Sequence, residues 1–139
     1  MIIHDTVSIV IERNGKYLLV KRANKPQKGA WAVPGGHVDR GETPKLAAIR
    51  ECNEEIGCKV DIKKKLFVIV HEVGLGHIHR ARIFLAQLKG SPKAGTDASA
   101  ARWFSPNQMA KINLTVYTIN IFNRFLSKSK LKRLANNGI

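Results

Sequence analysis

The chain has 139 residues, of which 44% are hydrophobic and 24% charged, so we expect one compact domain with a packed core and not a disordered chain. No apolar run approaches the roughly 18 residues of a membrane-spanning helix, and the N-terminus lacks a signal-peptide pattern, so we expect a cytoplasmic protein without a membrane partner. The formal net charge of +14 attracts phosphates, but basic charge without base-reading motifs is weak support for nucleic acid as the main target.

Two apolar segments near the N-terminus, residues 7–12 and 17–21, are predicted to be strands. The dipeptide Asn14-Gly15 between them is suited to a tight hairpin turn. A polar loop over residues 22–29 then leads to a short apolar run and to the breaker cluster at residues 34–36. The sheet is therefore expected to start at this hairpin.

A helix is predicted over about residues 44–56. Thr43 can cap its start, with Pro44 at the first helical position, and Gly57 is a good stop. At about 100° per residue, one side of this helix is apolar, and we expect four residues to enter the core there: Leu46, Ile49, Cys52 and Ile56. Cys52 and Cys58 are not expected to form a disulfide in a reducing compartment.

The opposite side of this helix carries three glutamates, Glu51, Glu54 and Glu55. Together with Asp39 and Glu42 they are half of the ten acidic residues in an otherwise basic chain. Clustered carboxylates repel one another unless a cation is present, and hard oxygen ligands of this kind suit Mg²⁺ or Mn²⁺. The alternative is an ordinary solvated acidic face of a surface helix.

Further strands are predicted after the helix, at residues 60–62, 66–70, 78–88 and 101–104. The segment from residue 106 to residue 126 carries apolar residues at helical spacing, and we expect it to form a helix that covers one face of the sheet. The residues that carry this pattern are Met109, Ile112, Val116, Ile119, Ile121 and Phe122. Residues 127–139 are expected to form a basic, frayed C-terminal tail that follows a domain spanning residues 1–126.

The segment from Gly36 to Cys58 resembles the Nudix box, in which Gly is followed after five residues by Glu and after seven more by Arg-Glu, then by Glu-Glu and Gly at fixed spacing. All seven fixed positions match. The two departures are Cys52 and Cys58, which stand where the family usually has aliphatic residues. Because free cysteine behaves as a small buried hydrophobe, neither departure threatens the chemistry.

The resemblance implies an α/β fold, an α/β/α sandwich with a mixed central sheet. It also implies a hydrolase in which Mg²⁺ or Mn²⁺ activates water to attack phosphorus in a phosphoanhydride, with no covalent intermediate. The expected metal ligands are three glutamates and one backbone carbonyl: Glu51, Glu54, Glu55 and Gly35. The expected catalytic residues are Glu54, Glu51 and Arg50, where Arg50 orients a glutamate by an ion pair. Glu42 is expected to support this geometry from outside the ligand set.

Arg22 and Gly36 are expected to bind substrate, Arg22 as a phosphate ligand and Gly36 by letting the backbone approach closely; an ordinary surface arginine is the alternative for Arg22. The general base stays open. The acidic residue that the family often has before Trp103 is absent, and Asp97 is the nearest acid. Four residues in or beside a Gly-rich loop could activate water or be ordinary surface groups: His71, Glu72, His77 and His79. Trp31 and Trp103 could stack a base, although burial in the core is the alternative.

The expected substrate is a nucleoside triphosphate or an ADP-ribose-like nucleoside diphosphate derivative, and a phosphoanhydride end of RNA is a less favoured partner. The window after the box, residues 73–76, carries none of the residues that mark family subclasses. A non-catalytic nucleotide- or RNA-binding module of the same fold is the alternative, but such a protein should have lost box glutamates. The sequence leaves the oligomeric state open, a homodimer included.

Overall fold

The structure, a computed structural model, describes residues 1–25, 27–93 and 98–126 of the chain. The predicted N-terminal hairpin is present: β1 (Ile2–Arg13) and β2 (Lys16–Arg22) pair in antiparallel fashion. Asn14 and Gly15 join them with φ angles of 53° and 75°, the backbone that a tight two-residue hairpin turn requires. No helix in the described ranges is long and apolar enough to cross a membrane.

The sheet is mixed, and its main path runs β3-β2-β1-β6-β5. β1 runs parallel to β6, whereas the remaining strand pairs of the described chain are antiparallel. Off the main path, β4 pairs with β1 and β7 pairs with β2. The strands after the hairpin are β3 (Trp31–Ala32), β4 (Gly35–His37), β5 (Val60–Gly74), β6 (His77–Leu88) and β7 (Ala98–Phe104).

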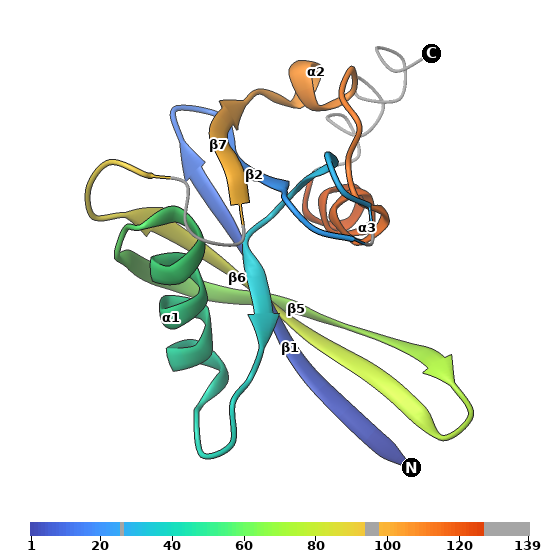
Figure 1. Cartoon of the computed structure of the whole chain (residues 1–139). Coiled ribbons are helices and arrows are strands. Elements are labelled where there is room, and N and C mark those ends of the chain that lie inside the picture. Colours follow the sequence, from blue (N-terminus) through green and yellow to red (C-terminus); the bar gives the residue numbers. More distant parts are fainter. Residues whose placement is uncertain (26, 94–97, 127–139) are drawn as a thin grey trace.

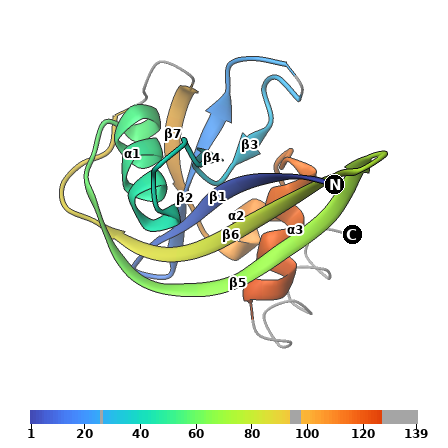
Figure 2. The same cartoon turned by 90° about the horizontal axis from the view of Figure 1, so that it is seen from below.

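Helices cover both faces of this sheet, with α1 (Pro44–Ile56) on one side and α3 (Val116–Phe125) on the other (Figures 1 and 2). Alternate residues of a strand face opposite sides. Accordingly, Ile9 and Ile11 of β1 pack in the core cluster that contains the buried residues of α1, and Val10 packs in the cluster that contains those of α3. The predicted α/β/α sandwich with a mixed sheet is therefore confirmed.

The box helix has the predicted bounds, but its buried side differs from the expectation. Thr43 accepts a hydrogen bond from the backbone N–H of Leu46, and Gly57 ends the helix with a φ of 59°. Leu46 is 56% exposed, so its assignment to the core was wrong. Two alanines, Ala47 and Ala48, are fully buried with Cys52 and Ile56 instead, because small side chains let the helix lie close to the sheet.

The predicted C-terminal helix over residues 106–126 is two helices, α2 (Pro106–Met109) and α3. Ser105 and Gln108 form a reciprocal capping box for α2, and Thr115 caps α3. Between the two helices, Leu114 forms an isolated bridge with Trp31, which interrupts the helical backbone. Periodicity alone therefore misplaced two residues: Val116 and Ile119 are exposed, at 61% and 41%.

The two short strands predicted at residues 60–62 and 66–70 belong to the single strand β5. Register shifts occur in its pairing with β6 around the lysines at positions 63–65. At such an irregularity an extra residue stays unpaired and the regular pairing resumes beyond it. The lysines therefore do not end the strand. The predicted Gly-rich loop after it is a hairpin between β5 and β6, so His71, Glu72, His77 and His79 lie on strands.

Candidate active site

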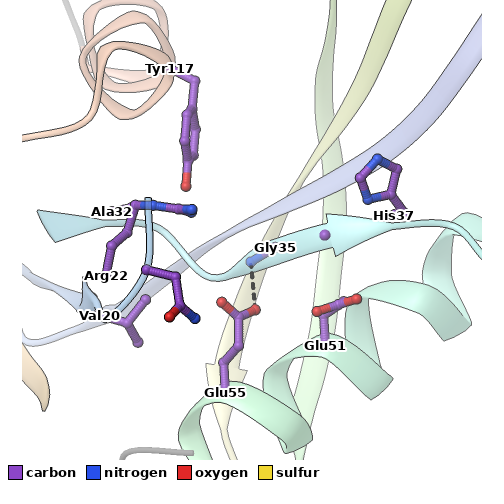
Figure 3. Close-up of a pocket in the computed structure, with 10 residues that line it drawn as sticks. Val20, Arg22, Ala32, Gly35, His37, Glu51, Glu55 and Tyr117 are labelled. Atoms are coloured by element: carbon purple, nitrogen blue, oxygen red, sulfur yellow. Dashed lines mark hydrogen bonds between the residues drawn. The ribbon is translucent and has the colours of Figure 1, made fainter. Parts of the chain in front are cut away.

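A pocket of about 250 Å³ opens beside α1, and Figure 3 shows that α1, the β4 region and α3 all contribute to it. It collects five residues predicted as site residues, Arg22, Gly35, Gly36, Glu51 and Glu55, together with five that were not: Val20, Asn24, Ala32, His37 and Tyr117. The sheet pairing and the packing of α1 and α3 thus gather a basic, an acidic and an aromatic group around one cavity.

The two glycines of β4 are required for different reasons. A Cβ on Gly35 would collide with the backbone carbonyl oxygen of Val7, because β4 pairs closely with β1 at this point. A Cβ on Gly36 would collide with the carboxylate of Glu51. Only Gly36 therefore leaves the space in which the Glu51 carboxylate lies against the backbone of the pocket.

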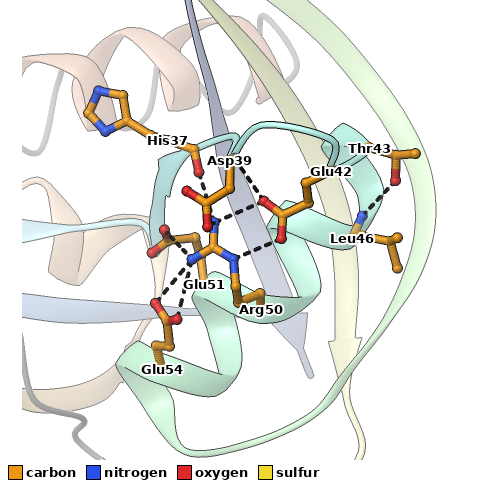
Figure 4. Close-up of polar contacts among 8 residues, drawn as sticks. All are labelled: His37, Asp39, Glu42, Thr43, Leu46, Arg50, Glu51 and Glu54. Carbon is orange, nitrogen blue, oxygen red and sulfur yellow. Dashed lines mark hydrogen bonds and ion pairs between the residues drawn. The ribbon is translucent and has the colours of Figure 1, made fainter.

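Arg50 connects the acidic residues of the box with one another (Figure 4). Its Nε donates to Glu42 Oε2 at 2.8 Å, and its Nη1 donates to Glu51 Oε1 at 3.0 Å and to Glu54 Oε2 at 3.2 Å. Its Nη2 also donates to the backbone carbonyl oxygen of His37 at 2.9 Å. The guanidinium therefore ties three acidic side chains to the end of β4, and it fixes their positions relative to the two glycines.

These interactions shift the pKa values of the two glutamates in opposite directions. The Arg50 guanidinium and the backbone N–H of Asp39 hold the pKa of Glu42 below its ordinary value. Burial raises the pKa of Glu51, and the ion pair with Arg50 offsets this only in part. The surrounding carboxylates raise the pKa of Arg50. Glu51 is thus a half-buried carboxylate whose negative charge Arg50 compensates only in part.

The three glutamates among the predicted metal ligands do not all face the pocket. Glu51 and Glu55 line it, and Glu55 Oε2 accepts a hydrogen bond from the backbone N–H of Gly35 at 2.9 Å (Figure 3). The Glu54 side chain is 49% exposed and reaches the others only through Arg50. In the described part of the chain, no three His, Cys, Asp or Glu side chains are arranged as a formed ion site. The metal-ligand assignments stay predictions.

The donor set nevertheless fits a hard divalent cation. Carboxylate oxygens are the ligands that Mg²⁺ prefers, and Glu51 and Glu55 supply them from neighbouring turns of one helix beside a bare glycine backbone. A positive ion here would also compensate the buried charge of Glu51. The residues present are therefore consistent with the metal that the box resemblance implies.

Tyr117 and His37 are pocket residues that sequence reasoning missed. Tyr117 is 39% exposed overall, but its hydroxyl points toward Arg22 in the pocket (Figure 3). Burial raises the pKa of Tyr117, whereas hydrogen bonds with Thr115 and Arg22 oppose the rise. A cap at Thr115 would have placed Tyr117 in the first turn of a helix, but only the three-dimensional packing sets that helix against Arg22. His37 directly follows Gly36, and this position next to a predicted site residue could have indicated that it lines the pocket.

The other candidates lie away from the pocket. Trp31 is buried in the core against Phe104, and Trp103 packs at the edge of the other core cluster, with Arg13 over its ring at 5.1 Å. Neither tryptophan lines the described pocket, so core packing accounts for both. Both cysteines are free and buried, as expected. Asp97 and the tail at residues 127–139 lie outside the described residues.

Comparisons with known proteins agree with this architecture. A family model for the NUDIX domain matches residues 3–125. An ADP-ribose pyrophosphatase of Methanocaldococcus jannaschii is 38% identical over 114 residues, which are 79% of this chain and 68% of that protein. A CTP pyrophosphohydrolase of Escherichia coli is 29% identical, over 88% of this chain and 91% of that protein. The crystal structure of a MutT NUDIX hydrolase from Burkholderia pseudomallei superimposes with a TM-score of 0.77 at 28% identity, covering 91% of this chain and 100% of that one.

Proposed function

Because this chain belongs to the Nudix hydrolase family and is a Nudix pyrophosphohydrolase, we propose that its pocket hydrolyses a phosphoanhydride bond in a nucleoside diphosphate derivative. The observation that carries the proposal is the pocket itself, in which Glu51 and Glu55 face Arg22 across the glycines of β4. A site for a polyphosphate and its counter-ion needs both signs of charge, because the cation requires oxygen ligands and the phosphates require donors.

Each residue of the box then has a distinct role. Glu51, Glu54, Glu55 and the Gly35 carbonyl would hold Mg²⁺ or Mn²⁺, which when bound supplies charge neutralisation and a more acidic water. Arg50 orients Glu51 and Glu54 through the hydrogen bonds from its Nη1, and Glu42 holds Arg50 from the opposite side. The missing side chain at Gly36 lets the Glu51 carboxylate lie against the backbone of β4. Gly36 is also proposed to let phosphate oxygens approach that backbone.

Arg22 is the proposed phosphate ligand. It lines the pocket from the end of β2, on the side away from α1, and Tyr117 lies beside it (Figure 3). A guanidinium can donate two parallel hydrogen bonds to one phosphate, and Tyr117 can donate a third from its hydroxyl. Together these groups would hold one phosphate of the substrate. The carboxylates and their cation would face the phosphorus that water attacks.

The names of two relatives support the proposed substrate class. The two described above are named for ADP-ribose and for CTP, so the proposed substrate is an ADP-ribose-like compound or a nucleoside triphosphate. The competing function is a nucleotide- or RNA-binding module without activity. The chain keeps all of its box acids, Glu42, Glu51, Glu54 and Glu55. Arg50 donates hydrogen bonds to the first three of them, which favours the enzyme.

The test is phosphate or nucleoside monophosphate release from a panel that contains ADP-ribose, CTP and other nucleotides, with and without Mg²⁺. Wild type is compared with Glu54→Gln and Glu55→Gln, which preserve side-chain size and remove the charge. We expect turnover by wild type that needs the metal and is lost in both variants. Equal turnover in all three proteins would refute the metal role of these glutamates. RNA binding that weakens with salt, without any turnover, would instead support the function of a non-catalytic binding module.

A further inference from the structure

The five histidines of the chain form one cluster that spans four strands of the sheet: β1, β4, β5 and β6. His79 lies at its centre. The centroid of its ring is 5.4 Å from that of His4, 5.6 Å from that of His71 and 6.5 Å from that of His37. His77 stacks on His4 at 5.2 Å between centroids. Of these residues only His37 lines the pocket, so the proposed function leaves four clustered imidazoles without a role.

The cluster lies at an end of the sheet that has few partners. The start of β1 and the β5–β6 hairpin project away from α1 and α3 (Figure 1). In the described chain, residues 2–4 of β1 pair with β6 alone, because the pairing of β1 with β4 begins at Thr6. His4 pairs with His79, which pairs with His71 on its other side. Directly paired residues project to the same face, so imidazoles of three neighbouring strands stand side by side there.

A hydrogen bond between two imidazoles joins the start of β1 to the start of β6. His4 Nε2 lies 2.9 Å from His77 Nδ1. One of these nitrogens donates and the other accepts, and a ring nitrogen accepts only in a neutral imidazole. When both rings carry an extra proton, no acceptor is left and two positive charges face each other in stacked rings. The contact therefore exists only while at least one of the two imidazoles is neutral.

The carboxylates nearest to the cluster in sequence are directed elsewhere. Asp5 and Glu72 each directly follow a histidine along their strand, and successive side chains of a strand point to opposite faces. Asp5 is bound there by two arginines of β6, at 2.8 Å and 2.9 Å. Asp39, two residues after His37, forms an ion pair with Arg50. Positive charge that enters the cluster therefore meets no compensating carboxylate among these three described acids.

Cations approach the same side of the sheet. Arg22 lines the pocket together with His37, and Arg124 of α3 lies over the ring of Phe67 at 4.7 Å. Burial and the positive charges of its three neighbouring histidines lower the pKa of His79. A proton on His79 is thus less favourable in the closed arrangement of the strands than on a free histidine.

We propose that the cluster is a pH-sensitive switch: neutral imidazoles hold residues 2–4 of β1 on β6, and protonation of His4, His77 and His79 releases them. A group whose pKa is lowered in the closed state binds its proton more readily in the open state, so a fall in pH favours opening. The opening stops at Asp5, because the arginines that bind it lower its pKa and keep its carboxylate ionised in the pH range of histidine. Acid therefore frees one end of the sheet while the strands of the pocket stay paired.

The experiment is amide hydrogen exchange of the full chain, followed by NMR at pH 8 and pH 5. Protection factors correct for the intrinsic effect of pH on exchange. The backbone N–H of Ile2 donates to the carbonyl oxygen of Gly76 and reports on the end of β1, and the N–H of Val10, buried in the same strand, is the reference. We expect the protection of Ile2 relative to Val10 to fall by about tenfold between pH 8 and pH 5. A difference of one pKa unit between two states changes their ratio by this factor.

Two variants test whether the imidazoles cause this fall. His79→Gln replaces the central imidazole with a neutral side chain that does not titrate, so the loss of protection at Ile2 on acidification should be clearly smaller than in wild type. Glu72→Gln is the matched control, because Glu72 lies on the same hairpin and faces the opposite side of the sheet. Its response to pH should equal that of wild type.

Titration of the His79 ring by NMR gives a measurement that wild-type protein alone can provide. The ring should take up its proton at a lower pH than a free histidine does, and at a higher pH in His4→Gln than in wild type, because one neighbouring positive charge is gone. The proposal is overturned if wild-type Ile2 keeps its protection relative to Val10 at pH 5, or if wild-type His79 titrates as a free histidine does. It is also overturned if folded His79→Gln loses as much protection as wild type on acidification.

Discussion

At the scale of single residues, Glu42 and Glu51 differ although both accept hydrogen bonds from Arg50. The hydrogen bonds from Arg50 and from the backbone N–H of Asp39 lower the pKa of Glu42. Burial raises the pKa of Glu51. A lowered pKa means that the ionised carboxylate stabilises the fold, and a raised pKa means that ionisation opposes folding. Ionisation of Glu51 thus costs folding free energy. This is consistent with the proposal that its carboxylate binds a cation.

The first prediction compares the matched variants Glu42→Gln and Glu51→Gln by chemical denaturation at several pH values. At pH 7, Glu42→Gln should lower the free energy of unfolding. This difference should disappear as the pH falls through the lowered pKa of Glu42, where the wild-type carboxylate becomes protonated. Glu51→Gln should unfold at the same or a higher denaturant concentration than wild type at pH 7, and that gain should vanish as the pH falls to the ordinary glutamate pKa of about 4.3.

A Glu51→Gln protein that is clearly less stable than wild type at pH 7 would contradict this account of the two carboxylates. It would show that the ion pair with Arg50 outweighs the effect of burial on Glu51.

The second prediction concerns Gly36. A methyl group at this position would displace the Glu51 carboxylate, and misplacement of a reacting or positioning group by about 1 Å can reduce activity by about 100-fold. We expect Gly36→Ala to lower kcat/KM by at least about tenfold while the protein stays folded. Gly74→Ala is the control, because a Cβ at Gly74 meets no atom within 4 Å. Similar kcat/KM values for the two variants would show that the contact with Glu51 is unimportant.

At the scale of elements, the helix ends and the hairpin turn could be predicted from the sequence, because Thr43, Gly57 and Asn14-Gly15 act through local backbone chemistry. The C-terminal helix was misjudged because its break depends on the bridge between Leu114 and Trp31, residues far apart in sequence. Leu46 was misjudged because the buried stripe of α1 is formed by alanines, which periodicity of large apolar residues does not reveal.

The third prediction tests how α3 is attached to the strand region that carries the glycines. Thr118 is fully buried, and its hydroxyl oxygen accepts a hydrogen bond from the backbone N–H of Val33 at 3.1 Å. Thr118→Val leaves that N–H buried without a partner, so we expect a loss of about 1–3 kcal/mol in the free energy of unfolding. Thr118→Ser keeps the hydroxyl and should lose less, as measured by denaturant titration. A Thr118→Val protein as stable as wild type, with a loss only in Thr118→Ser, would show that packing and not the hydrogen bond matters at this position.

At the scale of the whole molecule, the carboxylates of the box lie in a chain with a net charge of +14. The positions of Glu51 and Arg50 in the site followed from motif spacing. The contributions of Tyr117 and His37 did not, because they depend on how α3 and β4 pack around the pocket. The excess positive charge is distributed along the sequence, and its effect is a long-range attraction for polyphosphates.

The fourth prediction is that salt weakens capture of the substrate and leaves the chemical step unchanged. Raising the NaCl concentration from 0.1 M to 1 M shortens the Debye length from about 10 Å to about 3 Å. We expect kcat/KM for a nucleoside triphosphate to fall by about tenfold, with kcat at saturating substrate and Mg²⁺ nearly constant. A fall in kcat with an unchanged KM would instead indicate that salt perturbs the site.

The claim on which the account depends is that the box glutamates hold a divalent cation, and Mn²⁺ binding followed by electron paramagnetic resonance tests it most directly. Wild type, Glu51→Gln and Glu54→Gln are titrated with Mn²⁺, with Glu72→Gln as a control on the far hairpin. The account predicts saturable binding by wild type and the control, and at least about tenfold weaker binding by both box variants. Equal Mn²⁺ affinity in all four proteins would contradict it.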